Sequence, residues 1–468
     1  MTPILLLEIN EIPWRLIDRY IDRPDYPHLK EFFSESHHFT SRAVDTGELS
    51  PWVTWPTFHR GINNERHGIR NLGQDPSTFK GKPIWQDVRE TGGSIGICGS
   101  MQSWPPIDPG PGGFYVPDTF AHDEACIPAY LSPLQAFNLD QVRNNARVVN
   151  EGLPPARNKL ALMSALVRSG IRAGTMCRIM AQLFGELLDS DLRLRRPIYQ
   201  TILFWDVMRK QFNVAQPPAF STFFTNHIAG VMHRYWCDIF PEDFGERNPR
   251  LGKSQESLMR FALLVLDRML ADVLAWAKAN PSLVVIFASS MGQGAVHRDY
   301  HEGEEILVDD LPLLMQHAGL KEGDYCPLLA MVPQIAVEVR DPVKRGAAKT
   351  LLESAAAGNG ERFIGVQEVG VSLSVTVATP SLAAIRTDSV RIGSRGLTWK
   401  AAGFRKEVID PGTGYHVPEG TLVIYTSAND ASHLLQDRLT VHADKLKSWM
   451  LDIMRRGPSR IVELSRLT

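Results

Sequence analysis

The hydrophobic positions of the chain fall into short apolar runs that end in polar or small residues. Residues 3–9 (PILLLEI) predict a buried strand with Glu8 near its end, and a turn leads from there into a helix. A continuous apolar strand of this kind is typical of a parallel sheet that is covered by helices. Such sheets bind ligands beyond the carboxyl ends of their strands. Glu8 and Asn10 therefore stand where a site is expected.

Four more apolar runs predict further strands of the same sheet. They cover 94–98, 220–224, 283–287 and 422–425. A long helix is expected over 254–279, directly before one of these runs. Alternation of strands and helices predicts an α/β fold with a doubly wound, mostly parallel sheet.

Two stretches interrupt this rhythm. Residues 104–118 are rich in Pro and Gly and predict a loop, whereas 155–212 carry helical periodicity and predict an inserted helical cap. A second, small α+β insertion is expected from short alternating strands at 334–339 and 369–377. We assign the core to 1–103, 219–327 and 413–468, the loop and cap to 104–218, and the small insertion to 328–412.

Three arginines stand out in the predicted cap. Arg168 and Arg172 lie one helical turn apart, and Arg178 follows. We interpret them as a solvated helix face rather than as a phosphate-binding or membrane-binding stripe.

Composition narrows the classes of function. Of 468 residues, 44% are apolar and 22% are charged, which is typical of a globular protein. The net charge of −2 gives no basic excess for a nucleic-acid backbone, so no nucleic-acid binding is expected. The five cysteines are scattered and form no C-x-x-C pair, and the first residues do not have the pattern of a signal peptide. Both observations favour a cytoplasmic setting. No apolar run is long enough to predict a membrane span.

The strongest local motif lies in residues 50–69. It contains a T-x-P pattern at 54–56, then Gly61, then the tripeptide H-G-I at 67–69. This segment resembles the signature of the alkaline phosphatase superfamily, in particular its type I phosphodiesterases and nucleotide pyrophosphatases. The resemblance implies an alkaline-phosphatase-like sandwich that acts on a small phosphoester or related ester.

The resemblance leaves the nucleophile open between two hydroxyl groups. Thr54 supplies the T-x-P pattern, but the family's spacing to the glycine reaches back to Pro51, beside Ser50. A hydroxyl at a helix N-terminus lies in the positive end of the helix dipole, where an approaching phosphate is favoured. Thr54, Ser50 or neither acts in this way, and both residues also suit a helix start. His59 is a candidate base and Arg60 a candidate contact of the substrate's charge.

The metal ligands that the resemblance implies are only partly present. Glu8 takes the place of the family's first-strand Asp, and Asn226 takes the place of an Asp that precedes a ligating His. His233 follows Asn226 by seven residues, as if residues were inserted between the two ligands, and His416 matches a His before the final strand. A neutral amide binds a dication more weakly than a carboxylate does. Either His227 or His233 is alternatively a buried, hydrogen-bonded histidine.

A further metal-binding pair is missing. Ser290 and Met291 stand where the family has an Asp and a His, and neither side chain suits zinc. We therefore expect one divalent cation, zinc or manganese, or none. Gln293 and Asn10 are candidate amides for binding the substrate. The segment 297–304 is dense in His, Asp and Glu and predicts either replacement ligands or a solvated loop.

Three functions remain open at this point. The first is a hydrolase or transferase of phosphoesters with a reduced metal centre. The second is a catalytically inactive phosphatase-like protein that binds a ligand or a partner, and the third is a metal-independent enzyme that uses the same cleft. The sequence indicates neither the substrate nor the oligomeric state.

Overall fold

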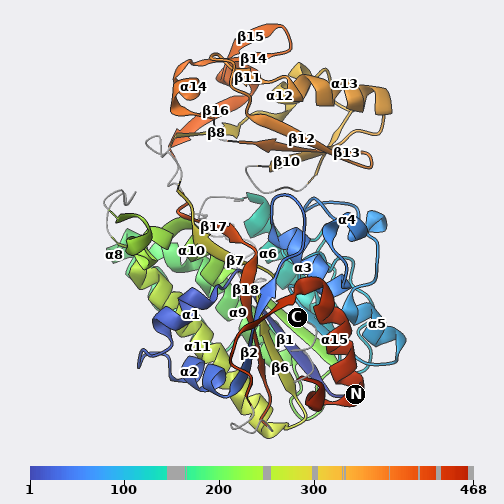
Figure 1. Cartoon of the computed structure of the whole chain (residues 1–468), viewed down its shortest axis with the longest axis vertical. Helices are drawn as coiled ribbons and strands as arrows, with labels where there is room; N and C mark the ends of the chain where they lie inside the picture. Colours follow the sequence, from blue (N-terminus) through green and yellow to red (C-terminus); the bar gives the residue numbers. More distant parts are fainter. Residues whose placement is uncertain are drawn as a thin grey trace. The chain divides into compact units, whose positions relative to one another are not determined.

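The structure of the chain is a computed structural model (Figure 1). It describes residues 1–144, 164, 166–245, 254–297, 304–328, 330, 334–378, 380–408, 412–427 and 434–461. The chain forms two compact units, of which the first comprises Met1–Ile69, Phe79–Val296 and Gly412–Thr468. The second unit comprises Arg70–Thr78 and His297–Pro411. Within the described part of the chain, no helix has both the length and the apolarity that crossing a bilayer requires.

An eight-stranded sheet forms the centre of the first unit. The order across it is β19 (Leu439–His442), β2 (Ser36–Arg42), β18 (Glu419–Tyr425), β6 (Val284–Ala288), β1 (Ile4–Ile9), β5 (Phe220–Thr225), β3 (Ile95–Cys98) and β4 (Phe114–Val116). Among these strands only β18 runs antiparallel to its neighbours, β2 and β6. The prediction of an α/β fold with a mostly parallel sheet is confirmed.

The central strand β1 is buried on both faces, as its apolar sequence predicts. Leu5, Leu7 and Ile9 pack into the large core that also contains residues of the long helix α11. Because successive side chains of a strand alternate between faces, Glu8 points to the opposite face. There it meets His59 of helix α3.

Helices cover both faces of this sheet, and α11, α9 and α2 lie on the side opposite to α3, α15 and α5 (Figure 1). The long helix predicted over 254–279 is α11. The helices of this unit are α1 (Trp14–Tyr20), α2 (Pro27–Ser34), α3 (Pro51–Arg60), α4 (Asn64–His67), α5 (Ile84–Glu90), α6 (Ser132–Asn144), α8 (Ala173–Leu188), α9 (Arg196–Gln211), α10 (His227–Ile239), α11 (Glu256–Ala279) and α15 (Ala443–Arg456). Short 3-10 turns lie at Ala129–Leu131, Ser190–Arg195 and Pro241–Asp243.

The predicted cap consists of helices, but it is part of the first unit and not a separate body. Val207 and Met208 of α9 lie in the same core as β1 and α11. The Pro/Gly-rich stretch before the cap also contains a buried strand, β4, which extends the sheet next to β3. Part of the predicted cap, residues 145–163, lies outside the described residues.

The second unit is a small α+β body with its own core. Its strands are β8 (Glu304–Val308), β9 (Cys326–Leu328), β10 (Gln334–Glu338), β11 (Ala356–Ala357), β12 (Ile364–Val369), β13 (Ser372–Val377), β14 (Ser389–Ile392), β15 (Arg395–Thr398) and β16 (Phe404–Val408). Its helices are α12 (Leu311–His317), α13 (Pro342–Glu353) and α14 (Leu382–Arg386), with 3-10 turns at Pro76–Thr78 and Lys400–Ala402. The unit includes residues before 328, the boundary we expected, because β8 pairs with β16 and Leu314 of α12 lies in the same core. The apolar stretch 369–377 belongs to a hairpin that turns at Gly370, whose φ is +60°.

A two-stranded hairpin carries two of the candidate residues of the first unit. Strand β7 (Gly292–Ala295) pairs with β17 (Gly414–Val417), so that Gln293 lies opposite His416. A Cβ atom at Gly414 would lie 2.5 Å from the carbonyl oxygen of Met232, on helix α10. Only glycine therefore allows this hairpin to lie so close to α10.

Candidate metal centre and nucleophile

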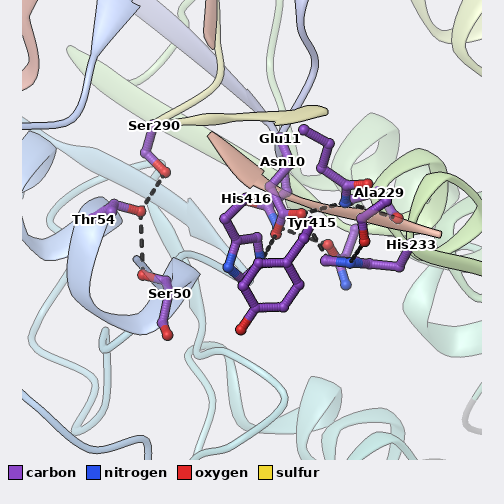
Figure 2. Close-up of polar contacts among 12 residues, drawn as sticks. Asn10, Glu11, Ser50, Thr54, Ala229, His233, Ser290, Tyr415 and His416 are labelled. Atoms are coloured by element: carbon purple, nitrogen blue, oxygen red, sulfur yellow. Dashed lines mark hydrogen bonds and ion pairs between the residues drawn. The ribbon is translucent and has the colours of Figure 1, made fainter. Parts of the chain in front are cut away.

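Three side chains converge beyond the carboxyl ends of the central strands: Glu11, His233 and His416 (Figure 2). Glu11 follows β1, His233 lies on α10 after β5, and His416 lies on β17. Their ligand atoms all lie within 4.8 Å of one another. Nε2 of His233 is 2.8 Å and Nε2 of His416 is 3.5 Å from the Glu11 carboxylate. We call these three residues the Glu11 cluster.

The backbone at Glu11 adopts the left-handed conformation, with φ of 62°. A side chain other than glycine in this region costs about 1–3 kcal/mol and persists only where its surroundings hold it. The hydroxyl group of Ser289 holds the turn, since it accepts from Ile12 N at 3.0 Å and donates to Ile9 O. Strain at a buried carboxylate is typical of a functional position.

Two amides also donate to the Glu11 carboxylate. Asn10 Nδ2 lies 2.6 Å from Oε1, and Gln293 Nε2 bonds Oε2 and also donates to Ala229 O at 3.1 Å. Asn10 and Gln293, which we predicted as contacts of the substrate, are buried next to Glu11. In this structure they position the carboxylate.

The charges of the cluster stabilise one another. Burial works to raise the pKa of Glu11, but His416 and His233 hold that pKa well below its ordinary value. Burial alone would lower the pKa of His416, but the Glu11 carboxylate and the backbone of Leu49 raise it above its ordinary value. The carboxylate is therefore ionised at neutral pH and available as a ligand.

The donor set fits a dication. One carboxylate and two imidazoles are the protein ligands of many catalytic zinc sites, which keep a fourth position for water or substrate. His233 Nδ1 lies 3.0 Å from Gly414 O, which fixes the tautomer that leaves Nε2 as the ligand. Gly414 therefore has two effects: it allows the hairpin to lie close to α10, and its carbonyl oxygen orients the ring of His233.

Helix α3 begins at Ser50 and Pro51, as a Ser-Pro helix start predicts. Ser50 is the N-cap residue, and among the described residues its side chain makes no capping hydrogen bond. The residues just before it lie next to the strand of His416: Glu48 accepts a hydrogen bond from the Tyr415 hydroxyl, and the backbone of Leu49 raises the pKa of His416. Ser50 is therefore at the positive end of the helix dipole, and the two residues before it lie next to Tyr415 and His416.

Thr54 lies one turn inside the same helix and is fully buried. Its Oγ1 is 2.7 Å from Ser290 Oγ and donates to Ser50 O at 3.3 Å. Both hydrogen bonds tie its hydroxyl to the protein. Ser50 is buried as well, at 5% exposure, but its side chain makes no capping hydrogen bond among the described residues, so of the two predicted hydroxyls we favour Ser50 for meeting a ligand.

Neutral side chains occupy the positions where the resemblance implies further metal ligands. Asn10 Nδ2 lies 2.7 Å from Asn226 Oδ1, and the buried Ser290 bonds Thr54. Met291 is buried as well. These contacts join the side chains to one another and leave the Glu11 cluster as the group of ligands that the described residues offer.

Glu8 and His59, which we predicted as a ligand and a base, form a separate buried pair. Their Oε1 and Nε2 atoms are 2.8 Å apart, and the Ser100 hydroxyl donates to the same oxygen at 3.1 Å. Glu8 lies within β1 and points to the α3 face, whereas Glu11 lies beyond the strand. The carboxylate that the structure brings to His233 and His416 is therefore Glu11 and not Glu8.

Arg60 lies at the opposite end of α3 from Ser50. Its guanidinium donates to Gly81 O and stacks on the ring of Phe79, with 5.4 Å to the ring centroid. A helix of this length separates its two ends by about 15 Å. The structure thus does not bring Arg60 to Ser50. Of the segment 297–304, residues 298–303 lie outside the described residues.

The alternative that His227 is a buried, hydrogen-bonded histidine is confirmed. Its Nδ1 lies 2.8 Å from Thr225 Oγ1 and its Nε2 lies 3.2 Å from Ala262 O. Burial lowers the pKa of His227 from 6.5 to about 4. The imidazole is therefore neutral in the folded protein at neutral pH and charged in the unfolded chain at pH 5.

This shift predicts a loss of stability in acid. Because the folded-state pKa is depressed, the contribution is complete above the unfolded pKa and is lost as the pH falls from 6.5 towards 4. The free energy of unfolding should fall by about 3 kcal/mol over this range through His227 alone. Urea unfolding of the wild type and of His227→Gln, at neutral and acidic pH, measures this difference.

The control for this experiment is His442→Gln, since His442 is exposed. We expect His227→Gln to lose stability at neutral pH but to show a clearly smaller fall in acid, and His442→Gln to follow the wild type. Equal falls in the wild type and His227→Gln would contradict the assignment.

Sheet, hairpin and cluster together define an α/β protein with a candidate metal centre at the carboxyl ends of its strands. No protein-family model matches the sequence, and a search of curated proteins finds no match. Solved structures do resemble the fold along nearly its whole length. Murine ectonucleotide pyrophosphatase/phosphodiesterase 5 is 11% identical, with 99% of each chain covered and a TM-score of 0.45. Its human counterpart is 12% identical, with 99% of each chain covered and a TM-score of 0.47.

A third similar structure is phosphonoacetate hydrolase from Sinorhizobium meliloti 1021, in complex with phosphonoformate. It is 11% identical, covers 97% of this chain and 96% of its own, and has a TM-score of 0.43. Identities this low say nothing of the activity.

Proposed function

We propose that this chain hydrolyses or transfers small phosphoesters or related esters, with one divalent cation at the Glu11 cluster and Ser50 as the nucleophile. The observation that carries the proposal is the convergence of one ionised carboxylate and two imidazoles. The residues just before Ser50, the N-cap of helix α3, contact the strand that carries one of these imidazoles. A metal ion can stabilise the charge of the transferring phosphoryl group, and a serine hydroxyl that makes no capping hydrogen bond can act as its nucleophile.

Glu11, His233 and His416 would hold the ion, and zinc or manganese suits these donors. A bound dication supplies positive charge that stabilises the transferring phosphoryl group. The surrounding residues fix the ligands: Gly414 O holds the ring of His233, and Gln293 and Asn10 hold the carboxylate.

The Ser50 oxygen would bond the phosphorus atom as the bond to the leaving alcohol breaks, and the hydroxyl proton would pass to the oxygen of that alcohol. Water or an acceptor alcohol would then take the phosphoryl group from Ser50. The positive end of the α3 dipole favours the negative charge of the phosphoester at that position. Thr54 and Ser290 lie beneath the attacking residue, and their mutual hydrogen bond holds the first turn of α3 in place. In this proposal Ser50 is the catalytic residue, and Thr54 is a positioning residue.

A second function is favoured by the neutral amide pair. Asn226, which takes the place of a charged ligand that the resemblance implies, bonds Asn10 at 2.7 Å. A site with one carboxylate where the family has several suits a protein that binds a phosphoester or related ligand without cleaving it. This alternative shares the Glu11 cluster with the first proposal and differs only in turnover.

The experiment that tests the proposal combines metal analysis with a substrate screen. Elemental mass spectrometry of the protein purified without chelator should find about one zinc or manganese per chain, as three protein ligands predict. The metal-loaded protein should then hydrolyse bis-p-nitrophenyl phosphate or p-nitrophenyl phosphate. Bound metal without turnover on any phosphoester would favour the binding protein. No metal, even after incubation with zinc and manganese, would exclude the metal-dependent proposal.

A further inference from the structure

Helix α8 (Ala173–Leu188) turns its apolar side outward. The buried residues of this helix are the polar Thr175, Gln182 and Glu186. Its large apolar residues are exposed instead: Met180 by 49%, Phe184 by 64%, Leu187 by 80% and Leu188 by 92%. The remaining exposed residues of the helix are small or apolar, namely Ala173, Gly174, Cys177 and Ala181. The helix thus presents a continuous apolar face, because these positions recur every three or four residues.

The buried polar side chains hold α8 in this orientation. Gln182 Nε2 donates to Leu192 O at 2.6 Å and to Glu186 Oε1 at 2.9 Å. The guanidinium of Arg196 pairs with the Glu186 carboxylate at 2.7 Å. A rotation that buried the apolar face would break this network and leave a buried charge without its partner, which is strongly unfavourable.

The chain around the apolar face is cationic. From residue 152 to 185 the sequence has five basic residues and no Asp or Glu; the five are Arg157, Lys159, Arg168, Arg172 and Arg178. Arg168 and Arg172 are exposed just before α8, next to Val167, which is 61% exposed. Arg172 also pairs with Asp206. The first exposed acidic residue after this stretch is Asp189, beyond the end of the helix.

We propose that α8 docks on an anionic phospholipid surface, with its apolar face in the interface and the arginines at the headgroups. An amphipathic helix with apolar side chains on one face and cations beside it binds such surfaces by both effects. The inference is independent of the metal centre, and it replaces our interpretation of Arg168, Arg172 and Arg178 as a solvated face.

A second copy of the chain suits this face less well. A twofold interface brings the same patch of both subunits together, so the cationic stretch of one copy would meet that of the other. Leu187 and Leu188 also protrude almost completely from the surface. Lipid accommodates protruding side chains, whereas a protein partner needs a pocket for each.

The test is co-sedimentation of the full chain with phosphatidylcholine vesicles, with and without phosphatidylglycerol. We expect binding to the anionic vesicles, weaker binding to the neutral ones, and a decrease with added salt. The double substitution Leu187→Ser and Leu188→Ser should weaken binding at least about tenfold, because two leucines no longer enter hydrocarbon. Arg168→Gln should weaken binding to anionic vesicles and leave binding to neutral vesicles unchanged.

The matched control is Val343→Ser, since Val343 is 80% exposed but lies on α13 of the second unit. It should bind like the wild type. All these positions are exposed, so unchanged thermal unfolding checks that each variant folds, and Phe184→Ser provides a second, independent loss of binding. The proposal would be overturned if the wild type did not bind anionic vesicles, or if the Leu187→Ser and Leu188→Ser double variant bound them as well as the wild type does. A dimer in light scattering that the double variant converts to a monomer, without vesicle binding, would assign the face to a second copy.

Discussion

The substitution Glu11→Gln is expected to weaken zinc binding by at least about a hundredfold. The glutamine has nearly the same shape and is no worse suited to the left-handed backbone, but it removes the anionic ligand of the Glu11 cluster. His233 and His416 would then face a neutral amide, and two imidazoles alone hold zinc weakly. Competition with a chromophoric chelator at neutral pH measures the affinity, and circular dichroism shows that the variant remains folded.

The control for this prediction is Glu8→Gln. Glu8 is an equally buried carboxylate near the end of the same strand, but it pairs with His59 on the other face of the sheet. It should keep the zinc affinity of the wild type. The reverse result, a loss in Glu8→Gln and none in Glu11→Gln, would make Glu8 the ligand, as the sequence suggested.

The second large effect is expected from Ser50→Ala, which should lower the turnover of a phosphodiester by at least about a hundredfold. Its hydroxyl is the proposed nucleophile, and alanine offers no replacement. An N-cap serine normally contributes about 1 kcal/mol to its helix. Because the Ser50 side chain makes no capping hydrogen bond among the described residues, the free energy of unfolding should change little. Loss of turnover with unchanged stability is the expected combination.

Thr54→Val is the matched control for Ser50→Ala. It removes a hydroxyl one turn further along the same helix and keeps the shape of the side chain. We expect a smaller fall in turnover, because the lost bond to Ser290 only loosens the first turn of α3. A larger fall in Thr54→Val than in Ser50→Ala would make Thr54 the nucleophile. Mass spectrometry of peptides from the enzyme quenched during turnover would then locate the phosphorylated residue.

Most of the central sheet could be predicted from the sequence, because its strands are nearly continuous apolar runs. Strand β1 and its neighbours β5 and β6 fall where the runs predict them. Strand β2 (SHHFTSR) was not predicted because its sequence is largely polar, although it pairs along its length with β18. Strand β4 was not predicted because the Pro and Gly residues around it indicate a loop.

The site was predictable in part. His233 and His416 were found from motif positions, and the structure brings them together. Glu11 was missed because it lies two residues beyond the strand, in a backbone conformation that a sequence pattern does not reveal for a glutamate. Glu8 is the acidic residue within the apolar run of β1, but side chains alternate along a strand, so Glu8 points to the face of the sheet that α3 covers.

The position of β18 in the sheet affects how the protein can be made. This strand is inserted between β2 and β6, and His416 comes directly before it in the chain. Until residues 412–427 are synthesised, β6 keeps an open edge, β2 lacks both of its neighbours β18 and β19, and the cluster has two of its three ligands. Open edges of this kind promote aggregation. We therefore expect the nascent chain to need protection through the synthesis of the whole second unit, and the proposed ion to bind with all three ligands only after His416 has left the ribosome.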